Sequence, residues 1–270
     1  MLLPCQDLLI LDQQVGNNNT KEHEKEDNSK RVNLIHEITG YTFHDPSLLQ
    51  QAFTHHSYEE DGSCASLERL AYVGDSVLNL LIANEQYLSY PDLDPGRLTR
   101  LRAVNVDTEK LARVALKHEL HKLLRHNKIL LSVQIKEFRN AIVEYPLHSS
   151  GLIDAPKVLA DIVESLIGAI FVDSNSSTDT TWKVVKNLLE PIITPSDIPT
   201  HPVVKLRELC QRKGFTLEIR DFWKESGEIE VVVDEEDVVG KAKYSAKRVI
   251  AMNRAALDAY NKIVEKNSWP

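Results

Sequence analysis

The chain has 270 residues, of which 27% are charged and 42% hydrophobic, and its formal net charge is −8 at pH 7. These values are typical of a globular protein with one large domain or two smaller ones. The negative charge excludes a uniformly basic surface. Nucleic-acid binding would therefore have to rest on local basic patches or bound cations.

The cysteines and the N-terminus bear on the cellular location. The three cysteines are widely spaced and form no C-x-x-C pair, which disfavours a cysteine zinc site and suits a reducing compartment. No apolar run is long enough to span a bilayer, so we expect no membrane partner. The N-terminus carries Asp7 and Asp12 without a preceding basic region, and we therefore expect no signal or transit peptide and a location in the cytoplasm or nucleus.

The first two thirds of the chain show helical patterning. Residues 1–29 are rich in asparagine and charge, which predicts a tail without a core. Asp45 and Pro46 predict an N-cap and a first helical position. Cys64–Tyr90 is a long apolar segment that predicts a buried helix. Helical periodicity resumes through LTRLRAVNVDTEKLARVALKHELHKLL and returns, after a predicted loop at Pro146–Ala155, in PKVLADIVESLIGAIFVD.

A proline-rich stretch at 195–201 separates this part from a C-terminal one and predicts a linker. We therefore expect an all-helical domain over 30–194 and a small domain over 202–266. The second domain begins with a short helix, continues with the runs TLEIRDF, EIEVVVDEED and VVGKAKYSA, and closes with a helix from Arg248 to Glu265. This order, α-β-β-β-α, makes the whole protein mainly α with one small mixed domain.

Two pairs of acids lie on apolar helices. Glu68 and Asp75 fall on one helical face with an alanine between them, and Asp161 and Glu164 are three residues apart on another. Their apolar neighbours predict partial burial, and buried carboxylates require a compensating arginine, hydrogen-bond network or divalent cation. Oxygen ligands from two rigid helices suit Mg²⁺ or Mn²⁺.

The alternative is that these acids are structural. Most helical acids pair with basic side chains or are solvated, and Arg69, Lys157 and Arg102 are the available partners. Lys157 lies four residues before Asp161 and shares its helical face. It could hold a phosphate or water near the metals, or it could neutralise Asp161.

Four segments resemble the ribonuclease III family. LERLAYVGDSVL resembles the family signature E-R-L-E-F-L-G-D-[SA]-V-L, LLQQAFTHHSY and LTRLRAVNVDTEKLARVAL are similar to the flanking motifs, and PKVLADIVESLIGAIFVDS resembles the second acidic motif. The agreement covers residues 32–191, and several motifs in register are far more specific than one. The sequence is most similar to plant ribonuclease-III-like, Dicer-related proteins with one endonuclease domain and a divergent double-stranded-RNA-binding domain.

The resemblance implies a Mg²⁺-dependent endoribonuclease that cleaves double-stranded RNA as a dimer, with Mn²⁺ as a substitute. It implies that Asp75 and Glu164 are catalytic core ligands, that Asp161 completes the metal site, and that Lys157 assists catalysis. Ala71 occupies the position of the fourth acid, and Pro95 appears where the family has a further one. Glu68 stands one turn earlier as a candidate replacement ligand.

The missing acid leaves two functions open. Two-metal hydrolysis of a phosphodiester needs an activated water and charge stabilisation on the leaving oxygen. Water can fill a vacant Mg²⁺ position, so weakened cleavage is one expectation. The alternative is a catalytically impaired protein that binds structured RNA or forms a heterodimer with an active relative. His55 and His56 are expected to pack and to form hydrogen bonds rather than to ligate metal.

The C-terminal domain resembles a double-stranded-RNA-binding domain. The resemblance implies that Glu208 faces the RNA minor groove and that a basic cluster of Lys243, Lys247 and Arg248 meets phosphates. Residues 199–270 contain 13 Lys and Arg against 12 Asp and Glu, a net charge of +1. Because phosphate contacts supply most of the affinity of such domains, we expect weak RNA binding or a domain adapted to protein contact.

Overall fold

The computed structural model describes residues 31–58, 65–234 and 238–266. The predicted tail at 1–29 lies outside these residues. The chain forms two compact units: the first gathers the chain up to Leu81 with Lys117–Asn127 and Asp161–Glu190, and the second gathers Ile82–Leu116, Lys128–Ala160 and the chain from Pro191 onward.

The N-terminal part of the described chain is helical. Residues 31–39 are helical, and α2 (Pro46–Ala52) begins as predicted, because the Asp45 carboxylate accepts the Ser47 N–H. The long helix predicted from Cys64 is α3 (Glu68–Ser89). It begins later than predicted, where the Leu67 N–H donates to the carbonyl of Thr54 instead of to its own segment.

The helix α7 (Lys157–Asp173) is apolar almost all round. Its apolar side chains with no exposed area are Leu159, Ile162, Val163, Leu166, Ile167, Ala169 and Ile170. The Ser165 hydroxyl, also fully buried, donates to the carbonyl of Ala52 at the end of α2, 2.7 Å away. A helix buried on most faces is a core element, and its few acids are correspondingly well fixed. The helix α8 (Thr178–Leu188) follows it.

The continuous helical stretch predicted after the signature helix is wrong, because it is broken into α4 (Pro95–Val106) and α5 (Thr108–Lys117). Asp107 has an extended backbone and its carboxylate accepts the Lys110 N–H, which caps a new helix. The 3-10 turn Leu120–Leu123 lies inside the stretch predicted to be helical, whereas the 3-10 turn Ile142–Glu144 and the helix α6 (Leu131–Ala141) were not predicted.

The C-terminal module has the predicted α-β-β-β-α order. It contains α9 (Pro202–Lys213), β1 (Leu217–Phe222), the short α10 (Trp223–Ser226), β2 (Glu228–Val233), β3 (Val238–Lys243) and α11 (Arg248–Lys266). The strands form an antiparallel sheet in the order β1-β2-β3. Ile229, Val231 and Val233 point into a core shared with α9 and α11. The protein is therefore mainly helical with one small sheet at its C-terminus.

No helix among the residues that the structure describes is both long and apolar enough to cross a membrane.

Candidate functional site

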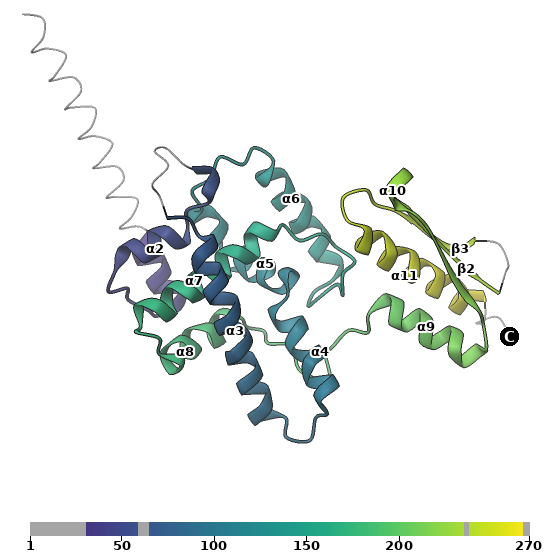
Figure 1. Cartoon of the computed structure of the whole chain (residues 1–270), viewed down its shortest axis with the longest axis horizontal. Helices are drawn as coiled ribbons and strands as arrows, with labels where there is room; N and C mark the ends of the chain where they lie inside the picture. Colours follow the sequence, from purple (N-terminus) through teal and green to yellow (C-terminus); the bar gives the residue numbers. More distant parts are fainter. Residues whose placement is uncertain (1–30, 59–64, 235–237, 267–270) are drawn as a thin grey trace, which may run out of the picture. The chain divides into compact units, whose positions relative to one another are not determined.

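The helices α3 and α7 lie against each other at two glycines (Figure 1). A Cβ placed on Gly74 would overlap the backbone carbonyl of Glu164 and would come within 2.9 Å of the backbone nitrogen of Gly168. A Cβ on Gly168 would overlap the carbonyl of Leu70. The two backbones are thus in direct contact, which only glycine permits at these positions.

This contact brings the predicted core acids near one another. Asp75 directly follows Gly74, and Glu164 is the residue whose carbonyl lies on Gly74. Asp75 is exposed, whereas Asp161 and Glu164 are half-buried, as their apolar neighbours predicted. One Asp75 oxygen accepts from the Asn79 amide at 2.9 Å. These oxygen donors match the preference of Mg²⁺ and Mn²⁺, although the assignment of each ligand stays a prediction.

The position of the missing fourth acid is buried. Ala71 is 7% exposed and its N–H donates to the Leu67 carbonyl in the first turn of α3. Pro95, at the position of the further missing acid, begins α4 with Asp94 as N-cap. Neither residue offers an oxygen ligand from its side chain.

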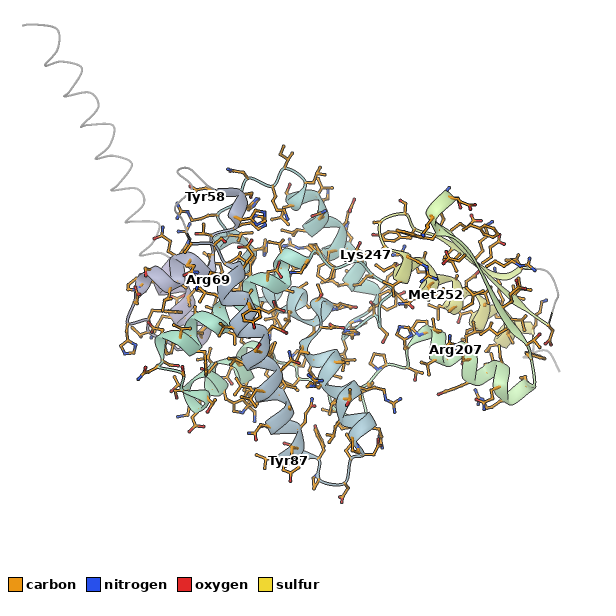
Figure 2. All side chains as sticks on the ribbon, viewed as in Figure 1. Tyr58, Arg69, Tyr87, Arg207, Lys247 and Met252 are labelled. Atoms are coloured by element: carbon orange, nitrogen blue, oxygen red, sulfur yellow. The ribbon has the colours of Figure 1, made fainter. Side chains whose placement is uncertain are left out.

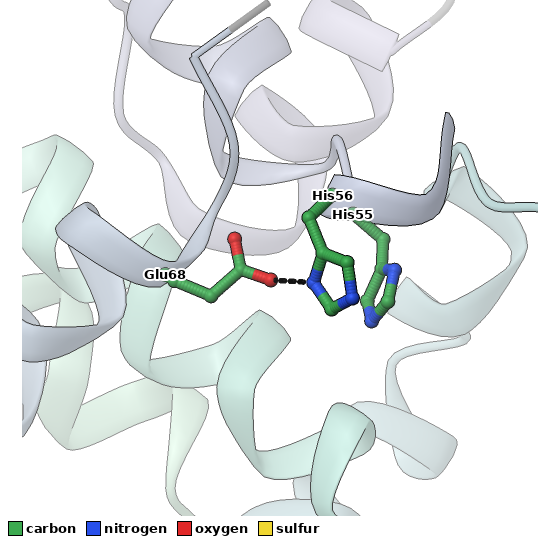
Figure 3. Close-up of side chains that lie close together, drawn as sticks. All are labelled: His55, His56 and Glu68. Carbon is green, nitrogen blue, oxygen red and sulfur yellow. Dashed lines mark hydrogen bonds and ion pairs between the residues drawn. The ribbon is translucent and has the colours of Figure 1, made fainter. Parts of the chain in front are cut away.

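Glu68 lies against His56, which was not among the basic partners that the sequence suggested (Figure 3). The His56 Nδ1 and a Glu68 carboxylate oxygen are 2.5 Å apart. Burial alone would raise the pKa of Glu68, but hydrogen bonds from Ser66 and His56 outweigh it and lower this pKa to about 2. Glu68 is therefore a carboxylate at neutral pH with one oxygen already engaged.

The segment that carries His56 is held by contacts with Arg125. The Arg125 N–H donates to the Phe53 carbonyl, and the His55 N–H donates to the Arg125 carbonyl. The Arg125 guanidinium also lies 4.3 Å from the centre of the Tyr58 ring. These contacts fix the histidines beside the start of α3, so the His56–Glu68 pair depends on a loop distant in sequence.

The side chains of His55, His56 and Glu68 offer ligand atoms within 4.8 Å of one another (Figure 3). Two histidines and a carboxylate are a donor set that suits zinc and related ions. The Ser57 N–H, however, donates to the Nδ1 of His55, so this nitrogen is already engaged and the neutral ring carries its proton on Nε2. The cluster therefore fits a metal only in part, and the expectation that the histidines form hydrogen bonds agrees with these contacts.

Lys157 is the exposed first residue of α7. It precedes Asp161 by one turn on the same helix, as the sequence predicted. Both of its interpretations, contact with phosphate and neutralisation of Asp161, stay open.

The predicted RNA-contacting residues of the C-terminal module occupy two places. Glu208 is exposed on α9, and Lys243 is exposed at the end of β3. Lys247 and Arg248 stand at the start of α11 (Figure 2). Each of these two cations holds a carboxylate, with 2.6 Å between Lys247 Nζ and Asp154 Oδ1 and 2.6 Å between Arg248 Nη2 and Asp221 Oδ2. Neither of these two ion pairs was predicted.

Comparisons with known proteins match the part of the chain that contains α3 and α7. Residues 68–175, which span α3 to the end of α7, match the model of the Ribonuclease III domain family. The chain is 46% identical over 237 residues to Ribonuclease 3-like protein 3 of Oryza sativa subsp. japonica, covering 87% of this chain and 79% of the relative. It is 38% identical over 244 residues to Ribonuclease 3-like protein 2 of the same organism, covering 88% of this chain and 76% of the relative.

A Dicer relative shows a more local similarity. The chain is 47% identical over 190 residues to Endoribonuclease Dicer homolog 1 of Oryza sativa subsp. japonica, which covers 68% of this chain and 10% of that much longer protein. The predicted similarity to plant proteins of the ribonuclease-III-like and Dicer types is thus confirmed.

Proposed function

The chain belongs to the ribonuclease III family, and on that premise we propose that it is an endoribonuclease that cleaves double-stranded RNA with the help of divalent cations. The observation that carries the proposal is the glycine-mediated contact between α3 and α7. It holds the backbones at Asp75 and Glu164 close together on two packed helices, which supports their proposed role as ligands of one metal site.

Asp75, Asp161 and Glu164 would hold Mg²⁺ or Mn²⁺, with Asp75 and Glu164 as the core ligands. Bound divalent ions activate a water and stabilise the charge on the leaving oxygen of the phosphodiester. The role of the chain is to fix carboxylates on a rigid scaffold, since preorganised charge is what lowers the barrier. Lys157, at the start of α7, would contact a phosphate or a water.

Ala71 weakens this site without removing it. A water in place of the missing carboxylate keeps the coordination number but leaves one less negative charge to attract the cation. We therefore propose slow cleavage that requires a higher metal concentration than an enzyme with all four acids. Glu68 is a weaker candidate for the vacancy, because a shift toward the metal would break its bond to His56.

A second function is supported by the burial of Ala71. Because Ala71 is 7% exposed, its replacement of an acid removes charge from an enclosed position. A protein that binds structured RNA, or that pairs with an active relative, would need the fold but not the metal. In that case the packing of α3 on α7 would serve the scaffold alone.

The deciding experiment compares four proteins on long double-stranded RNA in Mg²⁺ and in Mn²⁺: the natural chain, Glu164→Gln, Ala71→Glu and Glu37→Gln. Glu37 is an exposed acid of the first helical segment and serves as the matched control. The nuclease proposal expects cleavage by the natural chain and by Glu37→Gln, a loss of about 100-fold or more in Glu164→Gln, and a lower metal requirement in Ala71→Glu.

Other outcomes separate the two functions. No cleavage by the natural chain, with cleavage by Ala71→Glu, would establish the impaired protein on an intact scaffold. Cleavage that Glu164→Gln leaves unchanged would refute the assigned site. Since a buried glutamate without a cation is destabilising, the melting temperature of Ala71→Glu should be lowered in EDTA and restored by Mn²⁺.

A further inference from the structure

A loop of the second unit, Gly151–Asp154, contacts the start of α11 through its last residue. The Asp154 carboxylate accepts from Lys247 Nζ at 2.6 Å and from the Tyr244 hydroxyl at 3.0 Å. Burial and this hydrogen bond raise the pKa of Tyr244, so its hydroxyl stays a donor at neutral pH. The Asp154 side chain is 23% exposed and that of Lys247 is 49% exposed. The pair is thus partly shielded from solvent.

Two further contacts use backbone carbonyls of the same loop. The Asn253 amide donates to the Gly151 carbonyl at 2.9 Å, and Asn253 is only 1% exposed. Arg254 Nε donates to the Leu152 carbonyl at 2.9 Å. The Arg254 guanidinium also lies 4.7 Å from the centre of the Tyr244 ring. Four side chains of the module's last helix and the residues before it therefore meet one short loop with matched donors and acceptors.

The loop is itself built as a firm surface. The Ser149 hydroxyl donates to Glu109 and accepts the N–H groups of Leu152 and Ile153. Glu109 is 6% exposed and pairs with Arg113 at 2.7 Å. Because the buried Glu109 carboxylate on α5 fixes the Ser149 hydroxyl, which in turn accepts the loop N–H groups, the loop carbonyls and Asp154 keep their orientation.

The contact between Asp154 and α11 engages Lys247, a cation that RNA binding would also use. Lys247 and Arg248 are the basic residues at the start of α11 that were assigned to phosphate, and both already hold a carboxylate. Arg248 is paired inside the module, with Asp221, whereas Lys247 is paired outside it. A carboxylate offers an ammonium group the same kind of charge-assisted hydrogen bond as a phosphate oxygen. Lys247 therefore cannot form its full charge-assisted hydrogen bond with Asp154 and with an RNA phosphate at the same time.

We infer that Gly151–Asp154 is a docking surface for α11 and that Asp154 competes with RNA phosphate for Lys247, so that this loop lowers the affinity of the C-terminal module for double-stranded RNA. The inference rests on the proposed function for the identity of the nucleic acid. It concerns binding only and requires no cleavage.

The test measures binding of the full chain to a double-stranded RNA of about 30 base pairs, long enough for one such module. EDTA is present so that no cleavage occurs. The proteins are the natural chain, Asp154→Asn, Asp154→Asn with Lys247→Ala, and Asp221→Asn as the matched control. Asparagine at 154 keeps an acceptor for Tyr244 but loses the charge that holds Lys247. Hydrogen exchange of residues 149–155 reports docking.

We expect Asp154→Asn to bind RNA about two- to fivefold more tightly, the range in which partly exposed ion pairs contribute. The salt dependence of its affinity should steepen by about one phosphate contact, and exchange at residues 149–155 should quicken. Lys247→Ala should abolish the gain. Asp221→Asn should also strengthen binding, since it frees Arg248, but should leave exchange at the loop unchanged.

An Asp154→Asn variant with the affinity and salt dependence of the natural chain would overturn the inference, whatever the nuclease activity. Equal exchange at the loop in both proteins would overturn the docking surface. If Asp154→Asn strengthens binding while no variant cleaves RNA in Mg²⁺ or Mn²⁺, the inference stands and the proposed nuclease fails. A gain that persists when Lys247 is alanine would refute the competition for that residue.

Discussion

Asp173, the last residue of α7, holds the turn that leads into α2. Its carboxylate accepts from the Tyr41 hydroxyl at 2.7 Å and from the N–H groups of His44 and Asp45 at 2.9 and 2.8 Å. The side chain is 1% exposed. Burial by itself would raise the pKa of Asp173, but these hydrogen bonds outweigh it and hold the pKa below its ordinary value.

We predict that Asp173→Asn lowers the free energy of unfolding by roughly 1–3 kcal/mol at pH 7, the usual loss when buried donors lose their acceptor. A carboxylate whose pKa is depressed by folding stabilises the protein above its unfolded pKa, and loses that contribution as the pH falls through the folded value. The difference between the two proteins should therefore shrink below about pH 4.

Urea denaturation at pH 7, 5 and 3.5 measures this difference. Asp92→Asn, at an exposed turn position, is the control and should change stability by less than about 0.5 kcal/mol at each pH. A gap between Asp173→Asn and the natural chain that stays constant down to pH 3.5 would show that the charge of Asp173 is not what stabilises the turn.

Single residues also show where the sequence was informative about the site. Asp75, Asp161 and Glu164 were found from their motifs, and the predicted partial burial of Asp161 and Glu164 is confirmed. The partner of Glu68 was missed, because His56 reaches it only through a segment that Arg125 fastens. Contacts made by folding of a distant loop leave no local pattern that spacing can detect.

At the scale of elements, the crossing of α3 and α7 depends on Gly74 and Gly168. Neither glycine has a positive backbone φ, so their role is close approach and not a turn. The glycine before Asp75 in the signature is thus needed for the close packing of the two helices. It allows the backbone of one helix to rest on the backbone of the other.

We predict that Gly74→Ala destabilises the protein by roughly 1–3 kcal/mol or more, the usual cost of overpacking, and abolishes any cleavage activity. The added Cβ would overlap backbone and not a flexible side chain, so the helices must separate and move Asp75 away from Glu164. Thermal melts and the RNA cleavage assay measure both effects.

Gly96→Ala is the control for this change, because its Cβ would meet only the Asp94 carboxylate, at 3.1 Å. It should melt within a few degrees of the natural chain and cut RNA at the same rate. Normal activity of Gly74→Ala would separate the glycine contact from the site and would remove the observation on which the nuclease proposal rests.

The helices and strands could be predicted from the sequence where residues close in the chain determine them. The caps of α2 and the α-β-β-β-α order follow from residue types and periodicity. The break at Asp107 was missed because helical periodicity continues through it, and only its extended backbone reveals the cap. The helix α6 was missed because it buries just Leu131 and Phe138 and exposes Val133.

At the scale of the whole molecule, α3 exposes large apolar side chains. Tyr72, Leu80 and Tyr87 are 79, 58 and 72% exposed, and at 100° per residue they fall within about 80° of one another on the helix. Exposed apolar stripes of this size mark protein interfaces. We propose that this stripe is the contact between two copies of the chain, as the resemblance to ribonuclease III implies.

We predict that Leu80→Asp makes the protein monomeric, because an interface centred on Leu80 would have to bury an unpaired carboxylate. Sedimentation velocity across a range of protein concentrations measures the assembly, and cleavage of double-stranded RNA should fall with it. The substitution should leave the melting temperature of the monomer nearly unchanged, because Leu80 is 58% exposed and contributes little to the core.

Ile129→Asp separates a specific interface from general loss of apolar surface. Ile129 is 90% exposed and lies outside α3, so this variant should keep the mass of the natural chain at every concentration. A dimer that survives Leu80→Asp would move the interface away from the stripe. If the natural chain and Leu80→Asp are both monomeric at every concentration, the chain does not form a homodimer. That result would favour pairing with a relative, since the same stripe could then serve a heterodimer.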